Sequence, residues 1–405
     1  DLPVENCARL LFLSKLFLAL RSLMICRLKK SVGLSTFLTE TDQKIRELPK
    51  SYRDLFDLSK QIDLEMYVNA SDNIRAVGKA FDAWNEGFPS SVALIGEKGS
   101  GKSTLSNLLK EEVFKDQKII NVEIKQSTWK IEQILSLFGS AFEIKDVNRP
   151  EHIVNALNAL EERIVVNLEG LQKLYLRNIN GFDALDALWL IISETKEKVF
   201  WITTCSRYAW EFLNKVEGVE THFTHVFFTD ALSDGHIQSV IMNRHNKSVY
   251  RLNFEADESI RKSRNYKKRL NDPKAIQEYL KEIYFDRLGD ITEGNTSVAT
   301  ILWLRSIKKV EGRTLIIAPF QPVNIETLEI LKTETLFTLA AIVLHDTLKV
   351  AELCRVLNLT LAQSRVLLTR LKSRGVLIEE ESGYYLNQLV YRQVLRLLKR
   401  RNIIH

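Results

Sequence analysis

The middle of the chain alternates between two hydrophobic periodicities. Short runs of apolar, often β-branched residues predict five strands, at SVALIG (91–96), 119–124, 163–170, 199–204 and 222–230. Between these runs, apolar residues recur at helical spacing, for example at Leu185, Leu188 and Ile192. Strands that alternate with helices of this length are typical of a parallel sheet covered by helices on both faces. The predicted fold class is therefore α/β, with a five-stranded parallel sheet.

The same patterns divide the chain into four regions. Residues 1–50 are an apolar helix and a polar connector, 51–230 the α/β core, 231–330 a helical segment, and 331–405 a C-terminal domain. The polar, connector-like character covers residues 31–65 and so continues past the boundary at residue 50. The predicted strands stop after residue 230, and helices follow. A very charged piece, DESIRKSRNYKKRLNDPK, interrupts these helices. We interpret it as a solvated loop or exposed helix, with phosphate binding as the alternative.

The apolar helix is the string LLFLSKLFLALRSLMIC at residues 10–26. It includes Lys15 and Arg21, and it falls short of the roughly 20 apolar residues of a transmembrane helix. The basic residues of RLKK (27–30) suit either a cytoplasmic membrane edge or a solvated helix end. Membrane contact and packing on the rest of the protein are the alternatives. Because the chain opens with Asp1, we expect an upstream region before it.

Composition narrows the class of protein. A length of 405 residues predicts two or three domains, and 45% apolar with 27% charged residues excludes disordered and collagen-like chains. The four cysteines form no CxxC or CxxH pair, so neither a disulfide framework nor a zinc site is indicated, and a reducing, cytoplasmic location fits. The net charge of +6 is too small to imply polyanion binding by itself.

The strongest motif is a full GxxxxGK[ST] phosphate-binding loop between a predicted strand and a predicted helix. Its residues, with the next hydroxyl residue, are Gly96, Glu97, Lys98, Gly99, Ser100, Gly101, Lys102, Ser103 and Thr104. The glycines let successive N–H groups turn toward phosphate oxygens, and the helix N-terminus adds its positive field. We expect Lys102 to bridge the β- and γ-phosphates of ATP and Ser103 to ligate Mg²⁺.

Two strand ends offer groups for hydrolysis. Glu169, at the end of IVVNLEG, is the only acid there, and Leu168 precedes it where a Walker B strand carries Asp. Glu169 either polarises water, ligates the metal, or caps the turn beside Gly170. The next strand ends in Thr203 and Thr204, whose hydroxyls either hold water or phosphate or satisfy local backbone groups. Thr204 and Glu169 are the catalytic candidates, and either catalytic role of Glu169 leaves hydrolysis weaker than nucleotide binding.

This arrangement resembles AAA+ and STAND-type P-loop ATPases, in which a strand with polar residues lies between the Walker A and Walker B strands. The strings ALSDGHIQSVIMNRH and YFDRLGDITEGNTSVATILWLRSI look like the helical lid of those proteins and of origin-recognition initiators. Two features depart from the pattern. YVNASD (67–72) lacks the Gly-Arg pair near the adenine, and Ser297 stands where initiator-type lids carry a sensor arginine. The resemblance implies a switch or assembly ATPase, with homo-oligomers as partners, rather than a fast motor.

The C-terminal segment looks like a winged helix, with helices at 336–345, 349–356 and 361–374 before a strand pair near 381–383. From Lys349 to His405 it has eleven Lys and Arg against four Glu. The basic residues considered for duplex DNA are Arg365, Arg370, Lys372, Arg374, Arg392, Arg396, Lys399, Arg400 and Arg401. The acidic wing, Glu379 to Glu381, favours docking on the nucleotide domain instead. Two functions follow: a switch ATPase with a mobile winged helix, or an ATP-regulated DNA-binding protein.

Overall fold

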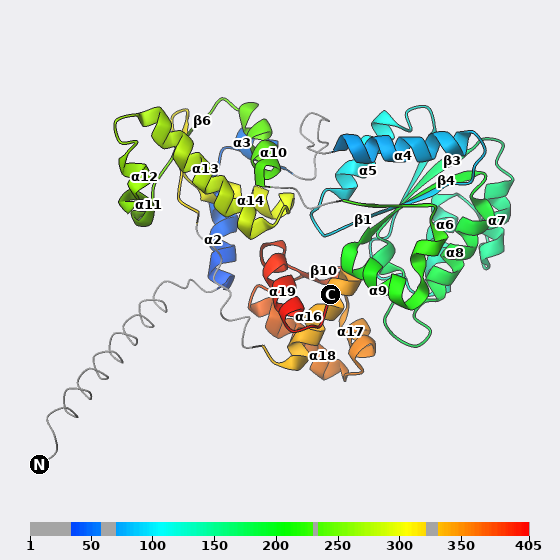
Figure 1. Cartoon of the computed structure of the whole chain (residues 1–405). Helices are drawn as coiled ribbons and strands as arrows, with labels where there is room; N and C mark the ends of the chain where they lie inside the picture. Colours follow the sequence, from blue (N-terminus) through cyan, green and yellow to red (C-terminus); the bar gives the residue numbers. More distant parts are fainter. Residues whose placement is uncertain (1–33, 58–69, 230–233, 321–330, 405) are drawn as a thin grey trace, which may run out of the picture.

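The computed structural model describes residues 34–57, 70–229, 234–320 and 331–404. They form a sheet domain (70–229), a helical region (34–57 with 234–320) and a C-terminal region (331–404) (Figure 1). The apolar string at 10–26 lies outside the described residues. No helix within the described ranges has both the length and the apolar character needed to cross a membrane.

The sheet domain contains five parallel strands in the order β2-β3-β4-β1-β5. Their bounds are β1 Ser91–Gly96, β2 Lys118–Glu123, β3 Ile164–Glu169, β4 Val199–Ser206 and β5 His225–Phe228. All five predicted strands are confirmed, and the α/β fold class with them. β4 lies between β1 and β3, so its polar end is beside the phosphate-binding loop and beside Glu169.

Helices cover both faces of this sheet. They are α4 Ala70–Asn85, α5 Lys102–Glu112, α6 Ile131–Ala141, α7 Pro150–Asn158, α8 Asp183–Thr195 and α9 Arg207–Glu217. Successive side chains of β4 alternate between the two faces, as strand geometry requires. Phe200 and Ile202 pack with α4 and α5, while Trp201 and Cys205 pack with the helices on the other side. Because β4 is buried on both faces, its sequence is mostly apolar throughout and does not alternate between apolar and polar residues.

The helical region is built from α2 Leu34–Glu47, α3 Lys50–Leu55, α10 Asp234–Asn246, α13 Pro273–Thr292 and α14 Thr296–Ser306. The polar connector expected up to residue 65 thus contains two helices. A buried network explains why α3 packs here. Trp303 of α14 donates its Nε1–H to the hydroxyl of Tyr52 on α3 at 3.1 Å, and that hydroxyl also bonds Nδ1 of His245 on α10 at 3.1 Å. Their partners are distant in sequence, so no local pattern revealed these helices.

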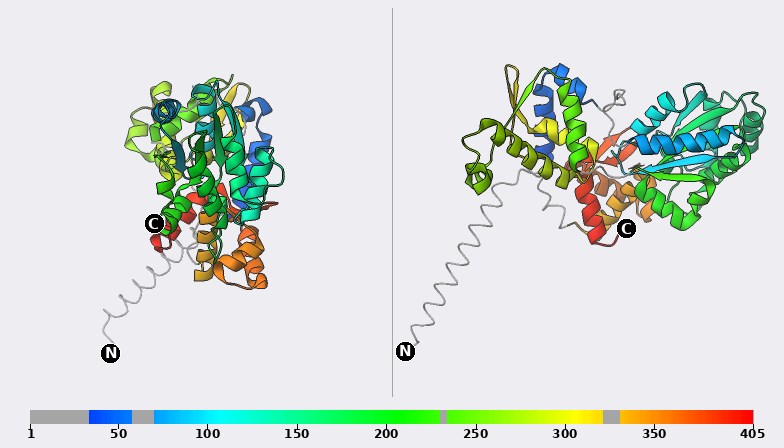
Figure 2. Two further views of the ribbon diagram at one scale, coloured as in Figure 1. Left: turned by 90° about the vertical axis from the view of Figure 1, so that its right-hand side faces the viewer. Right: turned by 45° about the horizontal axis from the view of Figure 1, so that its top comes forward.

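The helical region also contains a small sheet, although no strands were expected in residues 231–330. Its strands are β6 Arg251–Phe254, β7 Ile307–Glu311 and β8 Thr314–Ile317, in the order β6-β8-β7. Each has only four or five residues, too few for a clear two-residue periodicity. Two short helices, α11 Glu258–Lys262 and α12 Arg264–Lys267, lie at the end of this region that is far from the sheet domain (Figures 1 and 2).

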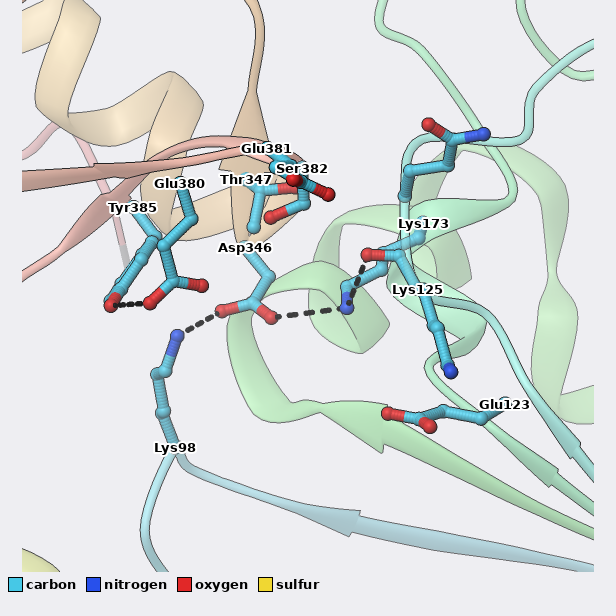
Figure 3. A pocket seen from close by; sticks show the side chains of 11 residues that line it. Lys98, Glu123, Lys125, Lys173, Asp346, Thr347, Glu380, Glu381, Ser382 and Tyr385 are labelled. Carbon is cyan, nitrogen blue, oxygen red and sulfur yellow. Dashed lines mark hydrogen bonds and ion pairs between the residues drawn. The ribbon is translucent and has the colours of Figure 1, made fainter.

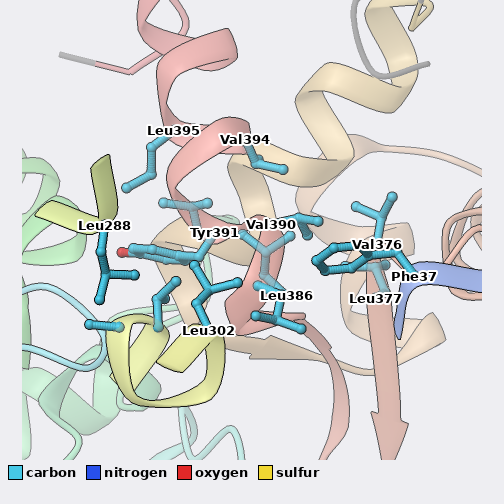
Figure 4. Close-up of a cluster of buried hydrophobic side chains, with 14 of the residues drawn as sticks. Phe37, Leu288, Leu302, Val376, Leu377, Leu386, Val390, Tyr391, Val394 and Leu395 are labelled. Atoms are coloured by element: carbon cyan, nitrogen blue, oxygen red, sulfur yellow. The ribbon is translucent and has the colours of Figure 1, made fainter. Parts of the chain in front are cut away.

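The C-terminal region contains α16 Thr333–His345, α17 Val350–Leu357, α18 Leu361–Ser373 and α19 Gln388–Arg400. A three-stranded sheet, β9 Thr347–Leu348, β10 Leu377–Glu380 and β11 Gly383–Leu386, completes it in the order β10-β11-β9. Figure 4 shows α19 residues Tyr391 and Leu395 packed beside Leu288 and Leu302 of the helical region. The two regions therefore share one apolar core.

Candidate nucleotide-binding site

The phosphate-binding loop (96–104) leaves the carboxyl end of β1 and enters α5, as predicted. Gly99 and Gly101 have φ values of 80° and 89°, which residues with a Cβ rarely adopt. At Gly96 a Cβ would lie 1.8 Å from the Thr229 hydroxyl, so only glycine fits there. The loop thus has the glycine-dependent turn before a helix N-terminus that phosphate binding requires.

Lys102 lies within this loop. Its ammonium group donates to the carbonyls of Gly96 and Glu97, each at 2.8 Å. Burial lowers the pKa of Lys102 to about 8, so the side chain is still mainly protonated at neutral pH. Among the described residues, this buried cation donates hydrogen bonds only to neutral backbone carbonyls. Negatively charged phosphate oxygens would be stronger acceptors and could replace them.

Ser103 and Glu169 meet at the sheet edge. The Ser103 hydroxyl donates to Glu169 Oε2 at 3.3 Å, and Asn167 Nδ2 donates to the other carboxylate oxygen at 3.1 Å. Asn167 is buried and also accepts a bond from Ser106 at 2.9 Å. A hydroxyl and a carboxylate placed together are oxygen ligands of the kind that Mg²⁺ prefers, so these residues fit that metal.

Thr204 lies directly opposite Glu169 in the β3–β4 register. Its hydroxyl accepts the backbone N–H of Gly170 at 3.2 Å and is largely buried. It therefore satisfies a local backbone group, which was the alternative to holding water or phosphate. The neighbouring Thr203 hydroxyl is buried and lacks a hydrogen-bond partner among the described residues.

The helical region touches the phosphate-binding loop through the turn between α13 and α14. Asn295 Nδ2 donates to the Lys98 carbonyl at 2.7 Å, and the Thr296 hydroxyl donates to the Gly99 carbonyl at 3.0 Å. A Cβ on Gly99 would lie 3.1 Å from Cβ of Ser297. The loop and the first turn of α14 are therefore in direct contact.

The C-terminal region contacts the same loop through Arg392 on α19. The Arg392 guanidinium lies 2.6 Å from the Glu97 carboxylate and donates to the backbone carbonyls of Thr292 and Glu293 at 3.1 and 3.0 Å. The Tyr208 hydroxyl donates to Glu97 Oε1 at 3.2 Å. The Arg392 side chain is only 8% exposed, and that of Glu97 is 14% exposed. One arginine thus connects three parts of the protein.

A second ion pair joins the loop to the end of α16. Lys98 donates to Asp346 Oδ1 at 2.7 Å, and Lys173 lies 3.9 Å from Oδ2 (Figure 3). Burial would raise the pKa of Asp346, but the two ammonium groups hold it below its ordinary value. Asp346 has a φ of 65°, a strained value for a residue with a side chain. Its neighbour His345 is buried and accepts the Arg177 N–H at 3.1 Å.

Lys98, Lys173 and Asp346 help to line a pocket of about 960 Å³ between the sheet domain and the C-terminal region (Figure 3). Lys98, Lys125 and Lys173 outnumber Glu123 and give the sheet-domain wall a net positive charge, while Asp346, Glu380 and Glu381 make the wall from the C-terminal region negative. The two walls are thus of opposite charge, and Asp346 joins them.

Sequence reasoning missed Asp346 and treated Arg392 as part of a basic surface. Arg392 lies three residues from both Leu389 and Leu395, and all three side chains are buried in α19. That position was the one clue that its charge points inward. Nothing local distinguished Asp346, because its Lys98 partner is 248 residues away.

No protein-family model matches this sequence, and no curated protein matches it. The ORC2 protein of Aeropyrum pernix, in its ADPNP-ADP complexes, shares 16% sequence identity and a TM-score of 0.51 over 86% of this chain and 98% of that chain. The chain has the P-loop NTPase fold. Two further P-loop neighbours are Cdc6p of Pyrobaculum aerophilum (12% identity, TM-score 0.46, 86% and 98% covered) and ORC1 of Aeropyrum pernix in complex with DNA (12%, 0.45, 86% and 96%).

Proposed function

We propose that this chain is an ATP-binding switch ATPase of the AAA+ and STAND type, in which the helical region is the lid and the C-terminal region a winged helix. One observation carries the proposal: both regions contact the phosphate-binding loop itself. Asn295 and Thr296 bind two of its carbonyls, while Arg392 and Asp346 pair with its Glu97 and Lys98 side chains. A ligand that occupies this loop therefore acts on both regions at once.

Nucleotide binding would bring a polyanion to a loop whose charged groups are already paired. Lys98 and Lys102 would gain phosphate oxygens as partners, and the phosphate would compete with the Asp346 carboxylate for the ammonium group of Lys98. The two pocket walls would still carry opposite charges, but the ion pair between Lys98 and Asp346 that joins them would be lost. Release of Asp346 would let the C-terminal region move, and such movement is the basis of the proposed signalling or assembly.

Ser103 and Glu169 would hold Mg²⁺, which when bound neutralises charge on the β- and γ-phosphates. Hydrolysis in this setting is slow, since Leu168 offers no ligand and Asn167 occupies one oxygen of Glu169. Glu169 has two roles available, orienting water or holding the metal, and either role makes the carboxylate necessary for turnover.

Glu169→Gln is expected to leave ATP affinity within about threefold and to slow hydrolysis by at least about tenfold, because the amide cannot take a proton or hold a cation as the carboxylate does. Single-turnover phosphate release and fluorescent-nucleotide titration measure the two effects. Glu123→Gln is the matched control, since Glu123 ends the neighbouring strand in register with Glu169. An unchanged hydrolysis rate in Glu169→Gln would remove Glu169 from the catalytic group.

Asp346→Asn tests the switch. Loss of the carboxylate removes the group that competes with phosphate for Lys98, so bound ADP is expected to dissociate at least about tenfold more slowly, an effect of roughly 1.4 kcal/mol. Stopped-flow release of a fluorescent ADP measures this rate. Asp183→Asn, an acid in the first turn of α8, is the control. Equal release rates in wild type and Asp346→Asn would contradict the proposed coupling.

Duplex DNA binding by α18 is the alternative function that the sequence left open. Arg365, Arg370 and Arg374 are exposed, and no carboxylate in the described part of the chain pairs with them. Lys372 by contrast pairs with Glu379 of the wing, and Arg392 and Arg396 face the rest of the protein. The basic surface available to DNA in this region is thus smaller than the sequence suggested.

A further inference from the structure

A dense group of positive charges lies at the end of the helical region. Residues 258–274 contain seven Lys and Arg against two acidic residues. The exposed cations among them are Arg261, Lys262, Arg264, Lys267, Lys268 and Lys274, here called the α11–α12 basic cluster. They lie on the side of the helical region away from the sheet domain (Figures 1 and 2). The cluster is therefore separate from the nucleotide site.

Two acids close to this cluster in the sequence, Asp257 and Asp272, form contacts with other groups. Asp257 pairs with Arg287 at 2.8 Å and accepts the Ile260 N–H at 2.7 Å. Burial would raise the pKa of Asp257, but Arg287 and these hydrogen bonds lower it to about 2. Asp272 caps α13 by accepting the N–H groups of Lys274 and Ala275. Within the described residues, neither carboxylate forms an ion pair with a cation of the cluster.

As a result, most of the cluster has no counter-charge. Across the described residues, no carboxylate pairs with Arg261, Arg264, Lys267, Lys268 or Lys274. Lys262 has only a 3.7 Å contact with the exposed Glu258. An unpaired group of like charges is unfavourable in the isolated protein, and an anionic partner would relieve that repulsion.

The backbone that carries the cluster is well supported. Ser263 caps α12 by accepting the Tyr266 N–H at 3.2 Å, and Ile260 is buried in the core of the helical region. The Arg269 guanidinium lies 4.8 Å from the Tyr279 ring centroid, which fixes the segment after α12 against α13. The cations are thus displayed on a defined surface rather than on a loose tail.

We propose that the α11–α12 basic cluster binds the phosphate backbone of duplex DNA. Protein interfaces are depleted in lysine at their centres, and amphipathic membrane-binding helices need an apolar face. In residues 258–274 the single large apolar side chain that is highly exposed is Leu270. A surface of Arg and Lys with almost no exposed apolar area instead matches the evenly spaced charges of a duplex. This inference goes beyond the proposed function and does not depend on it.

The test is fluorescence anisotropy of a labelled duplex of about 25 base pairs with the full chain, titrated from about 50 to about 200 mM salt. Arg264→Gln, Lys267→Gln and Lys268→Gln together are expected to weaken binding at least about tenfold and to reduce the slope of log affinity against log salt by about 2 to 3. The combined variant Lys267→Arg and Lys268→Arg retains the charge and is expected to bind like wild type.

The matched control removes the same charge from α18, through Arg365→Gln, Arg370→Gln and Arg374→Gln, and is expected to bind within about threefold of wild type. Equal losses in both triple variants, or a loss confined to the α18 variant, would overturn the proposal. Salt-independent binding by wild type would also overturn it, as would tight binding to anionic vesicles of phosphatidylglycerol without binding to the duplex. ATP affinity measured on each variant shows whether the nucleotide site is intact.

Discussion

Replacement of Lys102 by alanine is expected to reduce ATP affinity by at least about 100-fold, because the ammonium group would make charge-assisted bonds to two phosphates, each contributing about 1.5–3 kcal/mol. The fold is expected to stay intact, because Lys102 bonds only to the Gly96 and Glu97 carbonyls among the described residues, and water can replace it there. Titration with a fluorescent ATP analogue, together with thermal unfolding, measures both quantities.

Lys115→Ala is the control for Lys102→Ala. Lys115 is exposed just beyond α5, so this change removes the same charge without touching the loop. Its ATP affinity is expected to match that of wild type. Normal ATP affinity in Lys102→Ala would contradict the assignment of the loop as the nucleotide site, and the switch function with it, while leaving the DNA proposal for α11 and α12 untouched.

Arg392→Met is expected to destabilise the protein by about 3–5 kcal/mol, since it leaves the carboxylate of Glu97 in a largely buried position without its cation. The methionine keeps most of the packing volume beside Thr292 and Glu293, so the loss of charge is the main change. Chemical denaturation followed by circular dichroism measures the free energy of unfolding.

The double variant Glu97→Gln with Arg392→Met separates the ion pair from packing. Removing both charges takes away the unpaired carboxylate, so the double variant is expected to be more stable than Arg392→Met alone. Arg374→Met, an exposed arginine of the same region, is expected to change stability by no more than about 0.5 kcal/mol. A loss below about 1 kcal/mol in Arg392→Met would show that Glu97 and Arg392 do not form the buried contact described.

The Lys102→Ala and Arg392→Met variants affect two different roles of the phosphate-binding loop. Lys102 belongs to the group that would hold phosphate, whereas Arg392 belongs to the group that joins the loop to the C-terminal region. Glu97 links the two, because its carbonyl accepts Lys102 and its side chain pairs with Arg392. A change of ligand at the loop is therefore expected to alter the Arg392 contact without any intermediate element.

Local patterns were enough for much of the fold. The five strands of the parallel sheet were predictable, since each is a short apolar run next to a helical periodicity. The helices α16, α17 and α18 were also predicted near their observed bounds. By contrast, α2 and α3 were expected to be a connector, and β6, β7 and β8 were not expected at all. Those elements depend on partners far along the chain, such as Tyr52 for Trp303.

In the candidate site, too, some features follow from the local sequence and others depend on distant segments. The sequence alone determined the phosphate-binding loop, because glycines at 96, 99 and 101, a lysine and a hydroxyl at fixed spacing meet a local geometric requirement. Only the tertiary structure decided what surrounds that loop. Arg392 turns inward to Glu97, Asp346 reaches Lys98, and the acids near α11 and α12 turn away from the cations. A sequence does not show in which direction a charged side chain points. The packing of distant segments decides which charged side chains form ion pairs.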